Sequence, residues 1–335
     1  MNFWKSLNSK KTLTIDLGSR YIRACIFDEN KTPKKYIYDS AGIEYGLIVD
    51  ENKFKEVIEL LLSDINRDIQ SIPKNVLITI NSSEQNSASL SVVTYTKRAD
   101  GIITDLDIMN IKDNARKKIE HLKDKIILHD IIIKNKIDGN MILGDIRKTK
   151  GYKIESKVLF IYEDSRNYSI IQKTFGSLGV KIDKVLSGSV VEAEMLLSEK
   201  EKRLGTATLN IGHHITTLCV YERGLPILNL SIPYGGELIT SEIALSLRLD
   251  LDEAEEAKIN MNLKDYSRRR VEEIVENSVF KLSETINDNL DRVKRKGLLP
   301  GGLRILGGSS HLNRIENYLK YDLSLPSVNI NYDNR

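Results

Sequence analysis

"TATLNIGHHITTLCVYERGLPILNLSIPYGG" spans residues 206–236 and decides the fold, because it has the order strand, glycine turn, strand, turn, strand. "LTIDLGSRYIRACIFDENKTPKKYIYDSAG", residues 13–42, repeats that order, again with a D/N-x-G turn between its first two strands. Alternating apolar residues and β-branched side chains favour strands in both stretches. A three-stranded unit that occurs twice predicts two related lobes that face one cleft.

The segments around these units alternate between helix and strand. Residues 50–69 carry apolar side chains at helical spacing, with Asp50 or Asn52 as the N-cap, and residues 75–81 read as a buried strand. A long helix is predicted over residues 266–297, with its apolar positions on one core-facing side. This mixture of elements predicts an α/β fold.

Residues 85–157 differ from both units and predict a small strand–helix–strand subdomain inserted into the first lobe, in which Thr104 and Asp107 resemble a capping box. The predicted domains are a tail at 1–11, a first lobe at 12–84 and 158–203, the insert at 85–157, and a second lobe at 204–330 with a small helical subdomain at 249–297.

Composition excludes several classes of protein. With Lys+Arg 50 against Asp+Glu 47 the charge is nearly balanced, so no nucleic-acid partner is expected. Cys25 and Cys219 lie in apolar runs, which predicts buried, reduced thiols in a cytoplasmic protein. No Cys/His spacing typical of a metal site occurs, and no apolar run of about 18 residues is present to span a bilayer.

Three glycine turns predict a phosphate-binding cleft. The hairpin at Asp16–Ser19 offers backbone N–H groups and a hydroxyl to phosphate oxygens, with Asp16 beside a bound metal ion. The hairpin at Asn210–Gly212 offers N–H groups from the other lobe, and Gly307–Gly308 permits close backbone approach at a predicted helix start. Each turn alone is a weak signal. In this order, on repeated units, the turns are typical of the sugar kinase–chaperone–actin class of ATP-binding folds.

From about residue 12 to residue 330 the chain resembles the bacterial actin-like cell division protein family FtsA. The resemblance rests on "IDLGSRYIRA" and "GLIVDENKF" in the first lobe, and on "DGIITDLDI" and "ILHDIIIKNKIDG" in the insert. "IPYGGELITSEIALSLRLDLDEAEEAKI" and "LRILGGSSHLNRIENYL" extend it through the second lobe. The stretches in the insert are the more specific, because an insert of this kind does not belong to the ATPase fold in general.

The resemblance implies a two-lobed actin-like fold with Mg²⁺–ATP in the cleft and Asp16 near the Mg²⁺. It implies a cytoplasmic protein held peripherally at the inner face of the cell membrane, which self-associates through its insert and binds the C-terminal tail of FtsZ. It assigns no catalytic residue. The nucleotide-site positions that it implies are Asp16, Gly18, Ser19, Arg20, Asn210, Gly212, His213, Gly235, Gly236, Glu255, Lys258, Gly307, Gly308 and Ser309.

The second hairpin departs from the family pattern. Where the family has Asp-x-Gly-Gly-Gly, this chain has Asn210, Ile211, Gly212, His213 and His214. An amide carries no charge to order a metal-bound water, so ATP hydrolysis is expected to be weak or absent. The two histidines are interpreted as turn residues and not as a metal pair, because neighbours on a strand point to opposite faces.

Two alternatives stay open. "ITTLCVY" and the short segment between "EAEEAKIN" and "YSRRRVEEIVE" also resemble the pilus-assembly protein PilM, a cytoplasmic adaptor of the type IV pilus inner-membrane complex. The short segment lacks a hairpin usual in FtsA, which weakens the expectation of an FtsZ tail. A small-molecule kinase of the same class would need a carboxylate base in the cleft, and the sequence nominates none.

The two ends of the chain bear on membrane attachment. The sequence stops after "LPSVNINYDNR", before the last helix, linker and amphipathic membrane helix of the FtsA family. Either the chain is truncated or it attaches elsewhere. The candidate is "MNFWKSL", in which Phe3, Trp4 and Leu7 lie near lysines. A frayed tail is the alternative for this segment.

Overall fold

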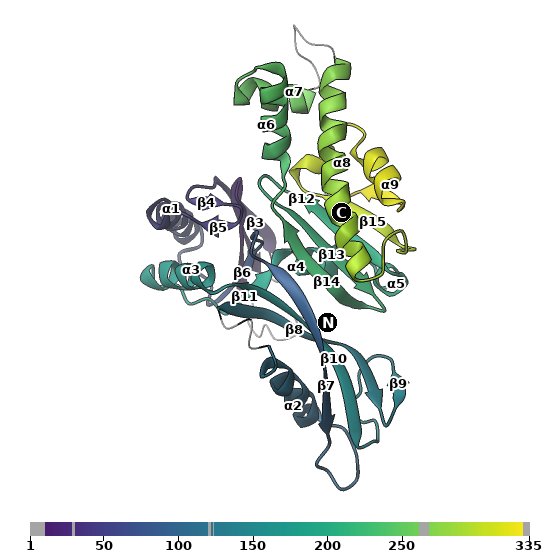
Figure 1. Cartoon of the computed structure of the whole chain (residues 1–335). Coiled ribbons are helices and arrows are strands. Elements are labelled where there is room, and N and C mark those ends of the chain that lie inside the picture. The colour runs from purple at the N-terminus through teal and green to yellow at the C-terminus, as the bar shows by residue number, and fades with distance from the viewer. Residues whose placement is uncertain (1–10, 29–30, 120–121, 123, 261–267, 331–335) are drawn as a thin grey trace.

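The structure is a computed structural model that describes residues 11–28, 31–119, 122, 124–260 and 268–330. In Figure 1 the first lobe lies at the left, the second lobe at the upper right, and the insert extends away from both at the bottom. The tail segment around Phe3 and the short segment at 261–265 fall largely outside the described residues.

The sheet of the first lobe has the strand order β11-β6-β1-β2-β3. The central strand β1 is parallel to β6 and antiparallel to β2, and β11 is parallel to β6. The strands are β1 (Lys11–Leu17), β2 (Tyr21–Asp28), β3 (Lys31–Asp39), β6 (Asn75–Ile80) and β11 (Lys184–Ser187). A short hairpin of β4 (Ile43–Glu44) and β5 (Leu47–Ile48) follows β3.

The sheet of the second lobe has the order β14-β13-β12-β15-β16, which matches the first sheet strand for strand. Its first three strands in the chain are antiparallel neighbours and its last two are parallel, as in the first lobe. The strands are β12 (Thr206–Ile211), β13 (Thr216–Glu222), β14 (Leu225–Ile232), β15 (Gly302–Leu306) and β16 (Ser327–Asn329). The repeat in the sequence is therefore a repeat of sheet topology.

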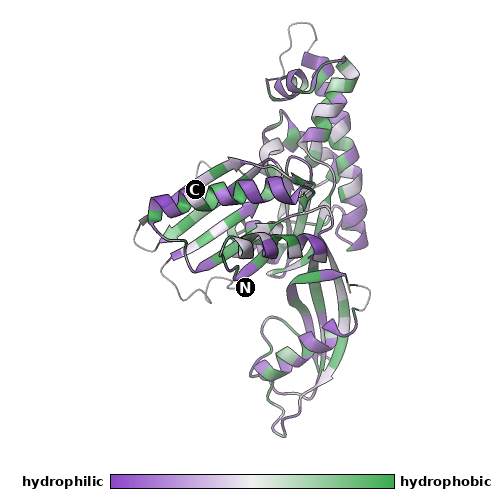
Figure 2. Ribbon diagram, turned by 90° about the vertical axis from the view of Figure 1, so that its left-hand side faces the viewer, coloured by the Kyte–Doolittle hydropathy of each residue, from purple (hydrophilic) through white to green (hydrophobic). Residues whose placement is uncertain are grey.

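Helices α1 (Glu51–Ile69) and α3 (Ser165–Ser177) cover one face of the first sheet. Asp50 caps α1 by accepting hydrogen bonds from the backbone N–H groups of Asn52 and Lys53, which settles the choice between the two predicted caps. The apolar stripe of α1 is fully buried against the sheet, and in Figure 2 both helices are banded by hydropathy while the strands beneath carry much of the green.

The described residues of the insert form a four-stranded antiparallel sheet and one α-helix. Its elements are β7 (Asn86–Tyr95), α2 (Asp105–Arg116), β8 (Lys125–Ile137), β9 (Asn140–Ile142) and β10 (Lys153–Asp164). The predicted capping box is present, since Asp107 accepts a hydrogen bond from the Thr104 backbone N–H at 2.8 Å. Strand β10 crosses the predicted boundary at 157/158 without a break and pairs with β7 on one side and β8 on the other.

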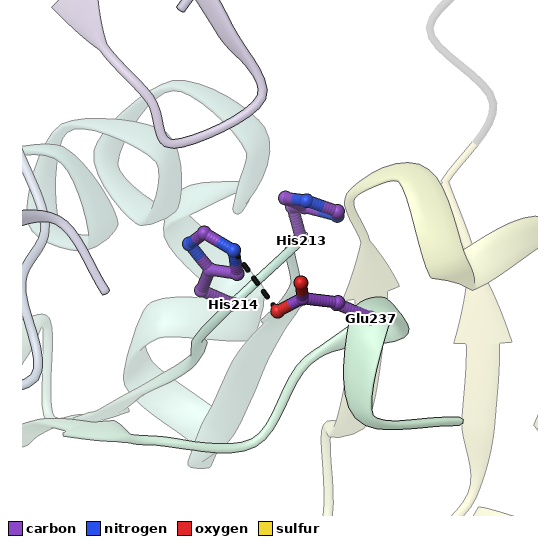
Figure 3. Close-up of side chains that lie close together, drawn as sticks. All are labelled: His213, His214 and Glu237. Carbon is purple, nitrogen blue, oxygen red and sulfur yellow. Dashed lines mark ion pairs between the residues drawn. The ribbon is translucent and has the colours of Figure 1, made fainter. Parts of the chain in front are cut away.

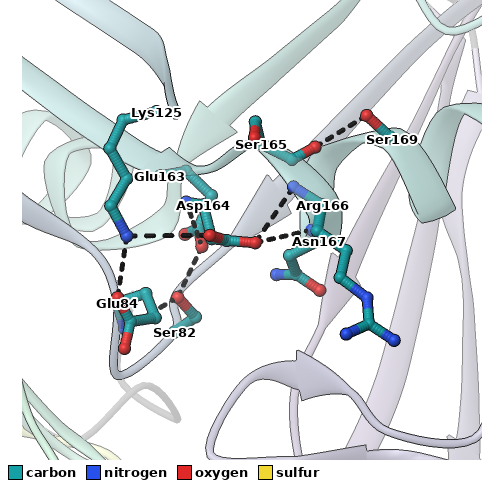
Figure 4. A network of polar contacts seen from close by, with 9 residues as sticks. All are labelled: Ser82, Glu84, Lys125, Glu163, Asp164, Ser165, Arg166, Asn167 and Ser169. Carbon is teal, nitrogen blue, oxygen red and sulfur yellow. Dashed lines mark hydrogen bonds and ion pairs between the residues drawn. The ribbon is translucent and has the colours of Figure 1, made fainter. Parts of the chain in front are cut away.

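A buried polar network ties the insert to the first lobe where β10 ends (Figure 4). Glu163 is fully buried and accepts a hydrogen bond from the Ser82 hydroxyl at 2.6 Å. Burial raises the pKa of Glu163, although hydrogen bonds from Ser82 and its neighbours oppose the shift. Lys125 pairs with Glu84 at 2.8 Å and with Asp164 at 3.6 Å. These contacts fix the base of the insert to the lobe.

Of the remaining helices, the first two lie in the segment that leads into the second lobe and the others belong to the second lobe. They are α4 (Gly188–Leu196), α5 (Glu199–Leu204), α6 (Gly236–Leu247), α7 (Leu251–Asn260), α8 (Arg268–Arg292) and α9 (Ile315–Leu323). The predicted core-facing side of α8 is confirmed, because Val271, Val275 and Leu282 are buried there. Among the residues that the structure describes, no helix has the length and apolar character that crossing a bilayer requires.

Helix α8 ends five residues before Gly297, where the sequence placed its end. Lys294 adopts a left-handed conformation with φ 58°, and the Arg295 N–H donates to the Leu290 carbonyl at 2.7 Å. This is the closure of a helix end that glycine usually provides. Here Lys294 adopts the left-handed conformation that ends α8, so Gly297 was a misleading signal for the end of this helix.

A separate apolar core joins the insert sheet and α4 to the second lobe. It combines residues of β8 and β10 in the insert sheet, of α4, and of β13 in the second lobe: Ile131, Leu159, Ile161, Val190, Ala193, Leu197, Cys219 and Tyr221. The predicted burial of Cys219 is confirmed, and Cys25 is half-buried. Because this core is shared, the insert sheet and the second lobe are packed against each other.

Candidate functional site

The two predicted hairpins form the same turn in each lobe. The N–H of Gly18 donates to the Tyr21 carbonyl at 3.2 Å, and the N–H of Gly212 donates to the Ile215 carbonyl at 2.9 Å. A β-carbon at Gly18 would lie 2.7 Å from the Tyr21 oxygen, and one at Gly212 would lie 2.9 Å from the Ile215 oxygen. Glycine is therefore required at both positions by close approach within the turn.

Backbone donors remain available in both turns. Within the described residues, the N–H groups of Ser19, Arg20, His213 and His214 donate to no other protein atom. The Ser19 hydroxyl accepts a hydrogen bond from the Gly46 N–H at 3.0 Å, which leaves its own proton free to donate. Unpaired N–H groups in a tight turn are the donors that bind phosphate oxygens in nucleotide sites.

A polar cavity of 440 Å³ lies between the lobes at these turns. It is lined by Ser19, Arg20, Asp39, Ser40, Gly42, Ile43, Glu44, His213 and His214. Asp16 lines a different, mostly apolar cavity of 340 Å³ on the sheet of the first lobe. The structure thus divides the first predicted phosphate motif between two cavities.

The Asp16 carboxyl is held by two neighbours. It accepts a hydrogen bond from the Thr79 hydroxyl at 2.9 Å and lies 3.8 Å from the Arg23 guanidinium. Although 44% of its side chain is exposed, desolvation raises the pKa of Asp16 against the opposing effects of Thr79 and Arg23. Asp16 is a carboxylate of the kind that binds a divalent cation, but it lines the apolar cavity and not the polar one, so its place near Mg²⁺ stays a prediction.

Glu192 is a carboxyl beside Asn210 that the sequence did not single out as a site residue. Its Oε1 atom accepts a hydrogen bond from the Asn210 amide at 2.7 Å, whereas its Oε2 atom is buried without a partner. Burial, followed by repulsion from the Asp16 carboxylate, raises the pKa of Glu192 to about 8. The sequence nominated no carboxylate base, and Glu192, largely protonated at neutral pH because of this pKa, does not supply one. An acidic residue in the apolar stretch "GSVVEAEML" was the available signal.

The N-terminus of α6 is packed against the second hairpin. Gly235 is its N-cap, and the N–H groups of Gly236 and Glu237 donate to the carbonyls of Gly212 and His213 at 2.8 and 2.9 Å. A β-carbon at Gly235 would lie 2.2 Å from the His213 oxygen. These glycines let the helix touch the turn, and its first N–H groups are already used by the protein.

Lys258 and Glu255, predicted to approach a nucleoside, lie on α7 and join it to α6. Lys258 is buried, and its ammonium donates to Gly236 O at 2.9 Å, to the Thr240 hydroxyl at 2.8 Å and to Glu255 at 2.6 Å. Burial tends to raise the pKa of Glu255, but the hydrogen bonds from Lys258 and Thr240 lower it overall. Lys258 therefore fixes the position of α7 against the first turn of α6, which packs on the second hairpin.

The "LGGSS" turn packs against both the second hairpin and the start of α6. Gly307, at φ 93°, leaves no room for a β-carbon, which would lie 2.3 Å from the Asn210 side-chain oxygen. Ser309 lies against Gly236, while a β-carbon at Gly308 would meet open space. The predicted helix start is a four-residue 3₁₀ turn, η3 (Gly308–His311), so it offers no sustained helix dipole to a ligand.

His213, His214 and Glu237 form a cluster at the edge of the polar cavity (Figure 3). The two imidazole rings lie 4.4 Å apart, and one ligand atom from each of the three residues falls within 4.8 Å of the others. The expectation that the two histidines point to opposite faces is wrong. They lie in a turn outside the strands, where side chains do not alternate.

His214 also reaches across the cleft. Its Nδ1 atom accepts a hydrogen bond from the Tyr45 N–H at 3.1 Å, its Nε2 atom lies 3.0 Å from a Glu237 carboxylate oxygen, and its ring stacks on Tyr45 at 5.0 Å. Tyr45 belongs to the turn between β4 and β5 in the first lobe. The histidine turn is therefore a contact between the lobes.

Comparisons with known proteins support the resemblance to the FtsA family that the sequence motifs indicate. A model of the family "Cell division protein FtsA" matches residues 207–334. The cell division protein FtsA of Neisseria meningitidis serogroup B is 26% identical over 267 residues, which cover 78% of this chain and 64% of that protein. FtsA of Bacillus subtilis is 22% identical over 329 residues, covering 90% of this chain and 74% of that protein. The match to the Neisseria protein thus spans less than two thirds of its length.

Solved structures share the fold. The PilM-PilN type IV pilus biogenesis complex aligns with a TM-score of 0.67 at 16% identity, covering 96% of this chain and 88% of that chain. MreB5 of Spiroplasma citri bound to ADP aligns with a TM-score of 0.60 at 10% identity, covering 96% and 92%. The predicted actin-like α/β fold is confirmed. The predicted resemblance to the FtsA family is also confirmed, as is the second resemblance to PilM.

Proposed function

We propose that this chain is an actin-like cell division scaffold that binds Mg²⁺–ATP between its lobes and uses the nucleotide as a conformational ligand. In this proposal it acts in the cytoplasm, peripherally at the inner face of the cell membrane. It associates with further copies of itself through the insert and contacts the C-terminal tail of FtsZ. The similarity to cell division proteins over most of the chain supports the cellular role.

The observation that carries nucleotide binding is the pair of matching turns. Gly18–Tyr21 and Gly212–Ile215 have the same internal hydrogen bond and hold unpaired N–H groups at one polar cavity. Phosphate oxygens bound by both turns would bridge the lobes. Such binding would stabilise the closed form by about 2.7 kcal/mol at a hundredfold excess over the dissociation constant, enough to bias assembly.

The charges in the cleft support slow hydrolysis or none. Asn210 is neutral, and Glu192 with its pKa near 8 is largely protonated at neutral pH. Neither side chain then offers the full negative charge that would activate a water beside a bound cation. Mg²⁺ would supply charge neutralisation of the phosphates, with Asp16 as the carboxylate that fits it.

A melting experiment tests nucleotide binding. Mg²⁺–ATP is expected to raise the melting temperature of the wild-type protein and to promote its assembly in sedimentation. Gly212→Ala should lose most of the shift, because the added methyl group distorts the second turn. Gly176→Ala, in open space on α3, is the matched control and should keep it. An unchanged melting temperature and unchanged assembly in the wild-type protein would refute the proposal.

The partner is tested separately by titrating a peptide of the FtsZ C-terminal tail into the protein, with and without Mg²⁺–ATP. Binding supports the division role. The second candidate is a PilM-like adaptor of the pilus inner-membrane complex, favoured by the short sequence between α7 and α8. Absence of peptide binding, together with a preserved response to ATP, would move the assignment to that candidate.

A further inference from the structure

We propose that His213, His214 and Glu237 form a site for a divalent transition-metal ion, Zn²⁺ by its donor chemistry, and that occupancy of this site releases the contact between His214 and Tyr45. This proposal does not depend on nucleotide binding. It concerns a second ligand, at the lip of the same cleft.

The donor set selects the kind of ion. Two imidazoles and one carboxylate are the three protein ligands of many open zinc sites, which leave a fourth position to water. Nitrogen donors favour zinc and its transition-metal neighbours over Mg²⁺ or Ca²⁺, which prefer oxygen. The ligand atoms already lie within 4.8 Å of one another, so modest side-chain rotation brings them to the roughly 3.4 Å spacing of a tetrahedral site with bonds of about 2.1 Å.

The backbone beneath the ligands is fixed. The Glu237 N–H donates to the His213 carbonyl at 2.9 Å, and Gly235 packs against the backbone of both histidines. The turn and the start of α6 thus hold the three side chains on one side of the hairpin (Figure 3). Only the side chains need to reorganise on binding, which keeps its entropic cost small.

His213 is free to bind an ion. Neither ring nitrogen of His213 takes part in a hydrogen bond within the described part of the chain. A neutral imidazole with no hydrogen bond on either nitrogen offers a lone pair to a metal ion.

The contact with Tyr45 and a metal ion compete for His214. A neutral imidazole has one N–H and one lone pair, and here Nδ1 accepts from the Tyr45 N–H, so Nε2 carries the proton that faces Glu237. A metal on Nε2 displaces that proton to Nδ1, where it opposes the Tyr45 N–H. A metal on Nδ1 takes the lone pair itself. Either way the hydrogen bond between the lobes is lost.

Zinc titration by calorimetry tests the site in full-length protein freed of metal with a chelator. One Zn²⁺ per chain is expected to bind, and His213→Asn or Glu237→Gln should weaken it at least about 100-fold. His311→Asn, which removes a histidine of η3 outside the cluster, is the matched control and should bind as wild type. Melting curves without metal identify any variant that fails to fold.

Co²⁺ in place of Zn²⁺ provides a second readout, since tetrahedral coordination gives intense visible absorption that the cluster variants should lack. Hydrogen exchange at the Tyr45 amide reports the coupling and should accelerate when Zn²⁺ binds. Stoichiometric binding that survives substitution of the cluster would overturn the site. Binding that leaves Tyr45 exchange unchanged would overturn the coupling.

Discussion

The side chains of Asn210 and Glu192 form a hydrogen-bonded pair, and this pairing accounts for the neutral residue at position 210. The Asn210 amide donates to the Glu192 carboxyl at 2.7 Å. At that distance a carboxylate at position 210 would repel an ionised Glu192. The neutral residue at 210 is therefore compatible with a protonated glutamic acid beside it. In the sequence, Asn210 indicates the loss of a charge that would order a metal-bound water. In the structure, Asn210 is one partner of a hydrogen bond with Glu192.

Glu192 should make stability fall as pH rises. Its native pKa near 8 exceeds its ordinary value of 4.5, so the folded protein holds the proton more tightly than the unfolded chain. The free energy of unfolding should then decrease between about pH 4.5 and 8, by at most about 1.4 kcal/mol per pH unit from this group. In urea denaturation between pH 4.5 and 8, the free energy of unfolding of Glu192→Gln should depend less on pH than that of the wild-type protein.

Glu256→Gln, a change at an exposed carboxyl of α7, is the control and should keep the wild-type pH profile. A Glu192→Gln variant whose slope equals that of the wild-type protein would show that Glu192 titrates normally in the folded state.

Among the secondary-structure elements, α8 offers a direct test of helix termination. Lys294 holds a left-handed conformation at its end, which costs a non-glycine residue free energy. Lys294→Gly should raise the free energy of unfolding by about 0.5–1 kcal/mol, measured by denaturant titration. Lys296→Gly, two residues on and outside the positive-φ positions, should give no gain. Equal effects of the two substitutions would contradict this account of the helix end.

How far the sequence predicts each element depends on how local its cause is. The hairpin turns and the buried side of α8 were predictable, because glycine placement and apolar spacing act within a few residues. The end of α8 was not, since Lys294 adopts a conformation that its type disfavours. The histidine cluster was also missed, because it needs Glu237 from another element. Burial of Glu192 likewise depends on the packing of both lobes.

At the scale of the whole molecule, Asn167 connects parts that are distant in the sequence. It is the third residue of α3, and its N–H donates to Asp164 at the end of β10. Its side chain accepts from the Ile48 N–H and donates to the Gly46 carbonyl, both at 3.1 Å. The turn held in this way contains Tyr45, which contacts the second lobe.

Asn167→Ala should loosen that turn and with it the cleft. The substitution leaves two buried backbone groups unpaired, at roughly 1–3 kcal/mol each, so denaturation should occur at lower urea concentration. Amide exchange at Tyr45 should accelerate as well. Asn167→Asp keeps the acceptor for Ile48 and should lose less. Protection of Tyr45 that is unaffected in Asn167→Ala would show that the turn is held by other contacts.

Strand β10 has a mechanical consequence. It runs unbroken from the outer part of the insert to Asp164, and hydrogen bonds continue from there through Asn167 and the β4–β5 turn to His214. If a neighbouring copy binds the insert, as proposed above, it contacts a strand that is connected through these hydrogen bonds to the Tyr45–His214 contact between the lobes. Force on the insert in such an assembly would then change how readily the two lobes separate at that contact.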